Sequence, residues 1–293
     1  MKMFWRLKTA AMFVFMTGLL VAIGAVIGYF VDDVWLGLLI MLGLSVAMNF
    51  YAYFGSKKAA LAANNVTLIQ REDCPELYEV VERLATKAGL PMPEVGISEV
   101  PMPNAFATGR NPKNAAVVAT RPLLDLLTEE ELEGVMAHEM SHVKNRDILV
   151  MSVASTLASM ISFLARIGVY SALANSGNKN GGGIIIMLLM EITLPIAAMM
   201  VQLGVSRSRE YLADESGGRL TGNPMALADA LMKLERGCAA PTNTYDRDAY
   251  ASMWISNPIS GKSFASNLFR THPSTAERIE RLRKLDMELR GFR

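Results

Sequence analysis

The sequence predicts a mainly α-helical integral membrane protein, with four transmembrane helices and an α+β domain that contains a small β-sheet. Two observations predict this fold class. Four apolar runs are long enough to span a bilayer, which takes about 20 residues, and they form two close pairs. The stretches after each pair are polar and show helix and strand patterns. The net charge of +1 gives no field that would attract nucleic acid, so we expect no nucleic-acid partner.

The first pair of apolar runs predicts an N-terminal transmembrane hairpin within residues 1–56. Its first run, residues 10–31, follows three basic residues and has the appearance of a signal peptide. Only Asp32 and Asp33 separate it from the second run, residues 34–54. A cleaved signal is rarely followed at once by another span, so we expect both runs to be retained as a hairpin.

Residues 57–147 are expected to form the first part of the domain. Residues 75–88 have the pattern of an amphipathic helix, which begins at a proline and ends at a glycine. Residues 95–100 alternate between apolar and polar and predict a strand. Residues 104–109 and 115–120 predict two more short strands, joined by a turn-forming segment. These three strands would form the small sheet.

The second pair of apolar runs predicts another transmembrane hairpin within residues 148–206. A helical hairpin buried in a soluble protein is the alternative, which the apolar length disfavours. Arg166 and Glu191 lie at similar distances on either side of the glycine-rich turn. We therefore expect them to pair, because an unpaired charge in a membrane costs at least a few kcal/mol. Alternatively, Arg166 extends alone to the membrane surface.

The distribution of basic residues predicts which side of the membrane the domain occupies. With four spans, only Lys179 lies in a loop on the far side. The positive-inside rule therefore places both termini and the hydrophilic segments in the cytoplasm. The basic residues on that side are Lys2, Arg6, Lys8, Lys57, Lys58, Lys144, Arg146, Arg207 and Arg209.

Residues 207–293 are expected to form the second part of the domain. A helix leads out of the fourth span, and Asn223 with Pro224 predicts the start of another. Residues 237–270 are loop-rich and are candidates to cover a cleft. Ser274 and a glutamate three residues later form a capping box for a final amphipathic helix.

The segment before the third span contains His138-Glu139-x-x-His142. A capping box formed by Thr128 and Glu131 predicts that this segment is helical. Residues four apart share one face of a helix, so the two imidazoles can bind one zinc ion. Glu139 beside them has the chemistry of a general base for water. The alternative is two surface histidines on an amphipathic helix.

A catalytic zinc usually has three protein ligands, so a third is expected elsewhere. Glu210 is our choice, because it follows the fourth span as closely as His142 precedes the third. The hairpin would thus bring the two segments together near the membrane surface. Asp214, four residues after Glu210, is placed to accept a hydrogen bond from a ligating imidazole. The alternative is a solvated acidic face that includes Glu215.

The sequence resembles the M48 zinc metalloproteases over essentially its whole length. The resemblance rests on His138-Glu-x-x-His142, Glu210-x-x-x-Asp214, Asn-Ala-Phe-Ala-Thr-Gly at 104–109 and His272-Pro. The number of spans is closest to the HtpX-type bacterial membrane proteases. The resemblance implies a zincin domain of the gluzincin kind that faces the cytoplasm, in a multi-pass protein of the bacterial inner membrane.

The resemblance also implies an activity and its residues. It implies an endopeptidase that removes misfolded or damaged membrane proteins, with one Zn²⁺ per chain bound by His138, His142 and Glu210. Glu139 would be the base, and His272 would stabilise the transition state. Arg278 matches an arginine found near the late histidine, and we expect it to contact substrate. For His272 the alternative is a capping or surface residue, and for Arg278 a surface charge.

We expect an extended substrate to pair with the strand that contains Asn104, Ala105, Phe106 and Ala107. The alternative for this segment is a purely structural strand. Substrates would be membrane proteins or unfolded polypeptides, met at the lipid bilayer. Two other functions stay open from the residues: a zinc hydrolase of a non-peptide bond, and a membrane scaffold whose metal site is vestigial.

Overall fold

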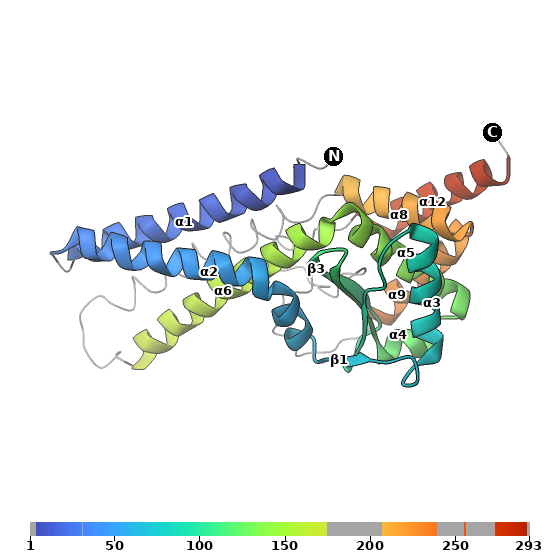
Figure 1. Ribbon diagram of the computed structural model, residues 1–293, viewed down its shortest axis with the longest axis horizontal. Helices are drawn as coiled ribbons and strands as arrows, with labels where there is room; N and C mark the ends of the chain where they lie inside the picture. The colour runs from blue at the N-terminus through green and yellow to red at the C-terminus, as the bar shows by residue number, and fades with distance from the viewer. Residues whose placement is uncertain (1–3, 31, 175–206, 239–254, 256–272, 292–293) are drawn as a thin grey trace.

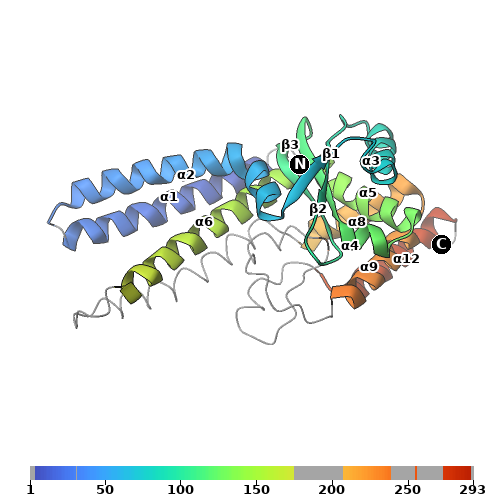
Figure 2. The same ribbon diagram turned by 90° about the horizontal axis from the view of Figure 1, so that it is seen from below.

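The fold is that of a computed structural model, which describes residues 4–30, 32–174, 207–238, 255 and 273–291. Three long helices extend from one side of a compact α+β domain (Figure 1). These helices run side by side in both views, and a small sheet lies between their domain end and the other helices drawn (Figure 2). The chain is thus mainly helical, as expected, with one mixed sheet.

Helices α1, Phe4–Phe30, and α2, Val34–Ala63, form the expected N-terminal hairpin. Both are long and apolar enough to cross a membrane. The side chain of Asp33 caps α2 by accepting a hydrogen bond from the amide of Leu36, 2.9 Å away. The turn lies at the end remote from the domain, and α1 begins on the domain side (Figure 1). Large apolar side chains along α2 are exposed, as a lipid-facing surface requires.

Helix α6, Asp147–Ala174, packs along α2 and contains the third apolar run. The helix at residues 129–145 meets α6 at an angle of 90°. These two helices count as a third candidate span only if they are taken together as one bent span. The fourth run lies in residues 175–206, outside the described residues, so four spans stay a prediction. The expected pair of Arg166 and Glu191 also lies outside the described side chains.

The sheet has four strands in the order β1-β2-β4-β3. They are β1, Val66–Ile69; β2, Glu94–Ser98; β3, Ala105–Asn111; and β4, Asn114–Thr120. Strands β2 and β4 pair in parallel, whereas the two outer pairs are antiparallel. The three expected strands are present. Strand β1 was not expected, because its four residues follow a long helix after only a two-residue turn at 64–65.

The domain core lies between the sheet and the helices. Helix α5, Glu129–Asn145, is at its centre and contacts α6 and three helices of the domain: α3, Pro75–Ala88; α8, Arg207–Thr221; and α9, Pro224–Cys238. The short α4, Arg121–Leu126, and the final α12, Thr275–Leu289, are the other helices among the described residues. Every residue of α5 from 134 to 143 is buried. The predicted capping box between Thr128 and Glu131 is present at its start.

Candidate metal centre

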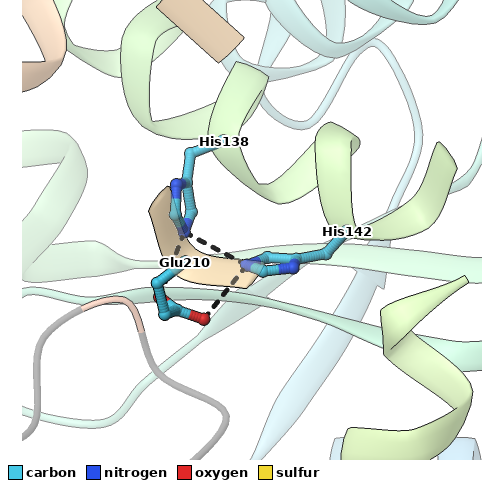
Figure 3. A group of neighbouring side chains, drawn as sticks. All are labelled: His138, His142 and Glu210. Carbon is cyan, nitrogen blue, oxygen red and sulfur yellow. Dashed lines mark hydrogen bonds and ion pairs between the residues drawn. The ribbon is translucent and has the colours of Figure 1, made fainter. Parts of the chain in front are cut away.

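The structure brings His138 and His142 of α5 together with Glu210 of α8 (Figure 3). The two Nε2 atoms are 3.2 Å apart. Oε2 of Glu210 lies 3.7 Å from Nε2 of His138, and Oε1 of Glu210 lies 3.5 Å from Nε2 of His142. All three residues are buried. The two histidines are therefore not on a surface, and Glu210 is not part of a solvated acidic face.

These distances fit one tetrahedral metal ion. Zinc binds imidazole nitrogen and carboxylate oxygen at about 2.0–2.2 Å, so neighbouring ligand atoms of a tetrahedral site are about 3.3 Å apart. The two nitrogens are 3.2 Å apart, and each has one of the two Glu210 oxygens at 3.5 or 3.7 Å, close to this value. Two imidazole nitrogens and a carboxylate also form a donor set that suits zinc. The three side chains can thus hold a divalent cation with little movement.

Close packing of α8 on α5 makes this meeting possible. A Cβ atom added to Gly217 of α8 would lie only 3.0 Å from the backbone nitrogen of His138. A Cβ atom on Gly134 of α5 would lie 2.8 Å from the backbone nitrogen of Leu227 on α9. Glycine at these two positions lets neighbouring helices approach the α5 backbone. The ligand of α8 therefore reaches the two ligands of α5.

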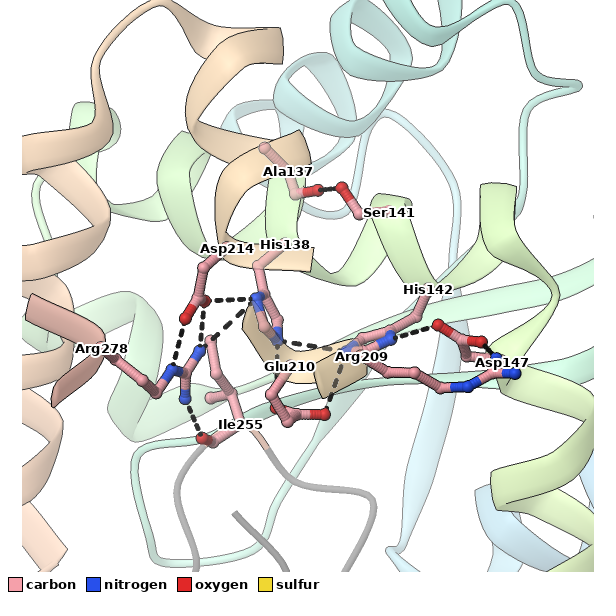
Figure 4. Close-up of polar contacts among 10 residues, drawn as sticks. All are labelled: Ala137, His138, Ser141, His142, Asp147, Arg209, Glu210, Asp214, Ile255 and Arg278. Atoms are coloured by element: carbon pink, nitrogen blue, oxygen red, sulfur yellow. Dashed lines mark hydrogen bonds and ion pairs between the residues drawn. The ribbon is translucent and has the colours of Figure 1, made fainter. Parts of the chain in front are cut away.

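Asp214 lies behind His138, where its Oδ1 is 2.9 Å from Nδ1 of the imidazole (Figure 4). Arg278 of α12 donates two hydrogen bonds to the same carboxylate, at 2.7 and 2.8 Å. Burial alone would raise the pKa of Asp214, but Arg278 and His138 lower it to about 2. The carboxylate is therefore charged at neutral pH, as a strong acceptor for the imidazole Nδ1–H must be.

Arg278 is buried in the domain, so the alternative of a surface charge is wrong. Burial alone would lower its pKa, but the carboxylates of Asp214, Glu210 and Glu139 raise it above the usual value for arginine. It also donates to the backbone carbonyl of Ile255, 3.1 Å away. These contacts favour a role in holding Asp214, and contact of Arg278 with substrate stays a prediction.

Glu139 is buried on α5 beside His138, and its carboxylate is among those that raise the pKa of Arg278. It is therefore within electrostatic reach of the same cluster. His272 lies outside the described residues, and its expected role stays a prediction.

Sequence reasoning did not find Asp147 and Arg209. Oδ2 of Asp147 is 3.3 Å from Nδ1 of His142, and its Oδ1 forms an ion pair with Arg209 (Figure 4). Asp147 is buried at the start of α6. The available signal was an aspartate five residues after His142, at the start of an apolar run.

The expected substrate strand, β3, is an edge strand of the sheet and contacts both α5 and α6. Asn104, Ala105, Phe106 and Ala107 are buried as whole residues, main chain included, so pairing of a peptide with this strand stays a prediction. Two backbone groups on its outer edge already have partners. The carbonyl of Ala105 accepts from the amide of Ile255, and the amide of Gly109 donates to Oγ of Ser152.

Comparisons with known proteins find similar sequences over most of the chain. The sequence profile of Peptidase family M48 matches residues 71–286. A protein named Protease HtpX homolog from Pyrococcus furiosus is 44% identical over 284 residues, which cover 96% of each chain. Proteins of the same name from Thermococcus sibiricus and Thermococcus kodakarensis are 44% and 45% identical, over 95% and 97% of each chain. These relatives are archaeal, so they do not support the expected bacterial inner membrane.

A solved structure has a similar fold. The crystal structure of Ste24p from S. mikatae superposes with a TM-score of 0.50, covers 94% of this chain and is 23% identical in sequence. The match spans 65% of the length of the Ste24p chain. At this identity the likeness bears on the fold alone.

Proposed function

The chain belongs to peptidase family M48. We propose that this membrane protease is a zinc-dependent endopeptidase, which cuts misfolded or damaged membrane proteins at the cytoplasmic face of the membrane. The observation that carries the proposal is the buried group of His138, His142 and Glu210. Its separations match the ligand spacing of one tetrahedral zinc ion. When bound, zinc would polarise the scissile carbonyl and lower the pKa of a water molecule.

The remaining buried residues supply proton transfer and orientation. Glu139 takes the proton from the attacking water and passes it to the leaving amine. Asp214, held by Arg278, accepts a hydrogen bond from Nδ1–H of His138, which leaves Nε2 of that ring as the ligand atom. We assign to His272 the donor that stabilises the oxyanion, as the resemblance implied.

The edge of β3 is the proposed site for the substrate backbone. In an antiparallel pair, alternate residues direct their backbone groups away from the partner strand. The backbone groups of Ala105 and Gly109 point away from β4, because both have hydrogen-bond partners on the outer side. Ala107 lies midway between these two residues, so its backbone groups point outward as well. An extended peptide would therefore pair with Ala107. This strand addition needs no particular side chain, which suits a protease of misfolded proteins.

The site lies next to the membrane helices, which supports membrane proteins as substrates. Helix α6 begins five residues after His142, and it packs along the candidate span α2. The start of α1 also lies on the domain side of the hairpin (Figure 1). The excess of basic residues at these helix ends supports a cytoplasmic domain.

Glu139→Gln tests the proposed function. We expect the variant to bind zinc as wild type does and to lose peptide cleavage by a factor of about 10² to 10⁴, because a general base is removed. The assay follows cleavage of an unfolded model protein by the detergent-purified full chain, with a lipid amide as a second substrate. Glu215→Gln, an exposed change on α8, is the control and should cleave normally. Normal cleavage by Glu139→Gln would refute the base assignment, and hydrolysis of the lipid alone would refute the peptidase.

A further inference from the structure

The two ligand histidines have matching surroundings on the ring nitrogen that points away from the metal position. Nδ1 of His138 contacts Asp214, which pairs with Arg278. Nδ1 of His142 contacts Asp147, which pairs with Arg209 (Figure 4). Each imidazole thus contacts a carboxylate, and this carboxylate in turn pairs with a guanidinium. The first set comes from α8 and α12, and the second from α6 and α8.

The contact between His142 and Asp147 depends on a break between two helices. In a continuous helix, residues five apart point in directions that differ by about 140°, so their side chains do not meet. Here α5 ends at Asn145, and Arg146 adopts a left-handed conformation with φ of 61°. Helix α6 then starts at 90° to α5. This turn directs the carboxylate of Asp147 back onto the ring of His142, and a non-glycine residue accepts an unfavourable backbone conformation to make it.

Arg209 connects this contact to the third ligand. It precedes Glu210 on α8, and its guanidinium pairs with the oxygen of Asp147 that does not face His142. One carboxylate therefore touches a ligand of α5 directly and holds the segment that carries the ligand of α8. Asp147 itself is the first residue of α6, a helix that packs along the candidate span α2.

The charged side chains around the ligands support the same conclusion. The buried Arg278 is near the carboxylates of Asp214, Glu210 and Glu139, and the partly exposed Arg209 pairs with that of Asp147. With neutral imidazoles, these side chains sum to a charge of −2, which one divalent cation would neutralise. Removal of one carboxylate would leave an excess positive charge beside the metal. The four carboxylates are those of Glu139, Asp147, Glu210 and Asp214.

We propose that Asp147 is a positioning residue of the metal site and that Arg209 holds it in place. Its Oδ2 accepts a hydrogen bond from Nδ1–H of His142, which keeps Nε2 unprotonated and directed at the metal. Its Oδ1 binds Arg209 and so fixes α8 against α6. The metal centre is thereby joined to a membrane-side helix through one carboxylate. This inference rests on the proposed zinc site.

The test measures zinc affinity of the metal-free full chain in detergent, by competition with a chelating dye, and the visible spectrum of the chain loaded with Co²⁺. We expect Asp147→Asn to weaken Zn²⁺ binding by about 10- to 100-fold and to shift the Co²⁺ bands. Arg209→Met should weaken binding by a smaller factor, and the double variant should bind no more weakly than Asp147→Asn. Asp229→Asn, an exposed change on α9, is the control and should bind as wild type does.

The outcomes separate positioning from a purely structural role. A lower melting temperature with unchanged zinc affinity and Co²⁺ bands would overturn the proposal. If Asp147→Asn does not fold, Arg209→Met decides: weaker binding supports the proposal, and unchanged binding overturns it. If the wild type binds zinc and cleaves, and both variants bind zinc as tightly as it does, the positioning role is overturned and the proposed function stands. A wild type that binds no zinc would overturn both.

Discussion

At the scale of single residues, the site shows how buried charge is compensated. Asp214 and Arg278 are both buried, and two short hydrogen bonds join them. Isolated charges of this kind are costly, so each depends on the other. The pair also fixes the ring of His138, because the same carboxylate faces its Nδ1. Stability and metal binding therefore depend on the same contacts.

Arg278→Met tests this dependence. We expect the variant to lose about 3–5 kcal/mol of stability, because it leaves the Asp214 carboxylate buried without its cation. The measurement is the melting temperature of the metal-free chain in detergent. Arg281→Met removes an exposed guanidinium from the same helix, where it lies over the ring of Tyr211, and should cost about 1 kcal/mol or less. Equal melting temperatures for the two variants would contradict the account.

Spacing predicts residues that lie on one regular element. His138 and His142 share a helix face, as do Glu210 and Asp214, so the sequence predicted these four together. Asp147 was not predicted as a site residue, because helical periodicity places its side chain away from His142. Only the break in the helix at Arg146 turns the Asp147 side chain back towards His142. The hydrogen bond from Arg278 to the carbonyl of Ile255 was not predicted either, because a contact with a backbone group does not depend on the residue type.

At the scale of elements, α5 is held against α3 by an ion cluster of Arg83, Lys87, Glu129 and Glu133. Glu133 of α5 accepts from Arg83 at 3.0 Å and from Lys87 at 3.2 Å. Burial alone would raise the pKa of Glu133, but the two cations lower it below the usual 4.5. Because the folded-state pKa is lowered, the stabilisation is complete above pH 4.5. It is lost as the pH falls through the lowered value.

Glu133→Gln should therefore destabilise the chain at pH 7 by about 1 kcal/mol or less, since the cluster is partly exposed. The difference from wild type should shrink as the pH falls below 4.5 and vanish once wild-type Glu133 is protonated. Melting temperatures of both chains across this pH range are the measurement. Glu235→Gln, an exposed change on α9, should show no such trend. A difference that stays constant with pH would rule out the ion cluster as its cause.

The edge of β3 gives a second prediction at this scale. Ala107→Pro removes the amide that we expect to donate to substrate, and it leaves the inward bonds to β4 in place. We predict a higher KM for an unfolded substrate with little change in zinc affinity. The comparison is Lys113→Ala in the exposed turn between β3 and β4. An unchanged KM in a folded Ala107→Pro variant would count against strand addition.

At the scale of the whole molecule, two distant parts of the chain form one site. Helix α5 follows the sheet, and α8 follows the second apolar pair, yet they pack together in the domain core. The sequence predicted this meeting from the position of the spans. It predicted neither strand β1 nor the sharp bend before α6, because β1 is short and the apolar pattern continues through the bend.

Zinc titration of the metal-free full chain, with cleavage of an unfolded protein followed at each step, tests the central claim most directly. The account predicts no cleavage without metal and a rise that saturates at one zinc per chain, because one buried ligand group is present in the described residues. Cleavage that is equally fast without zinc, or a chain that binds none, would contradict it.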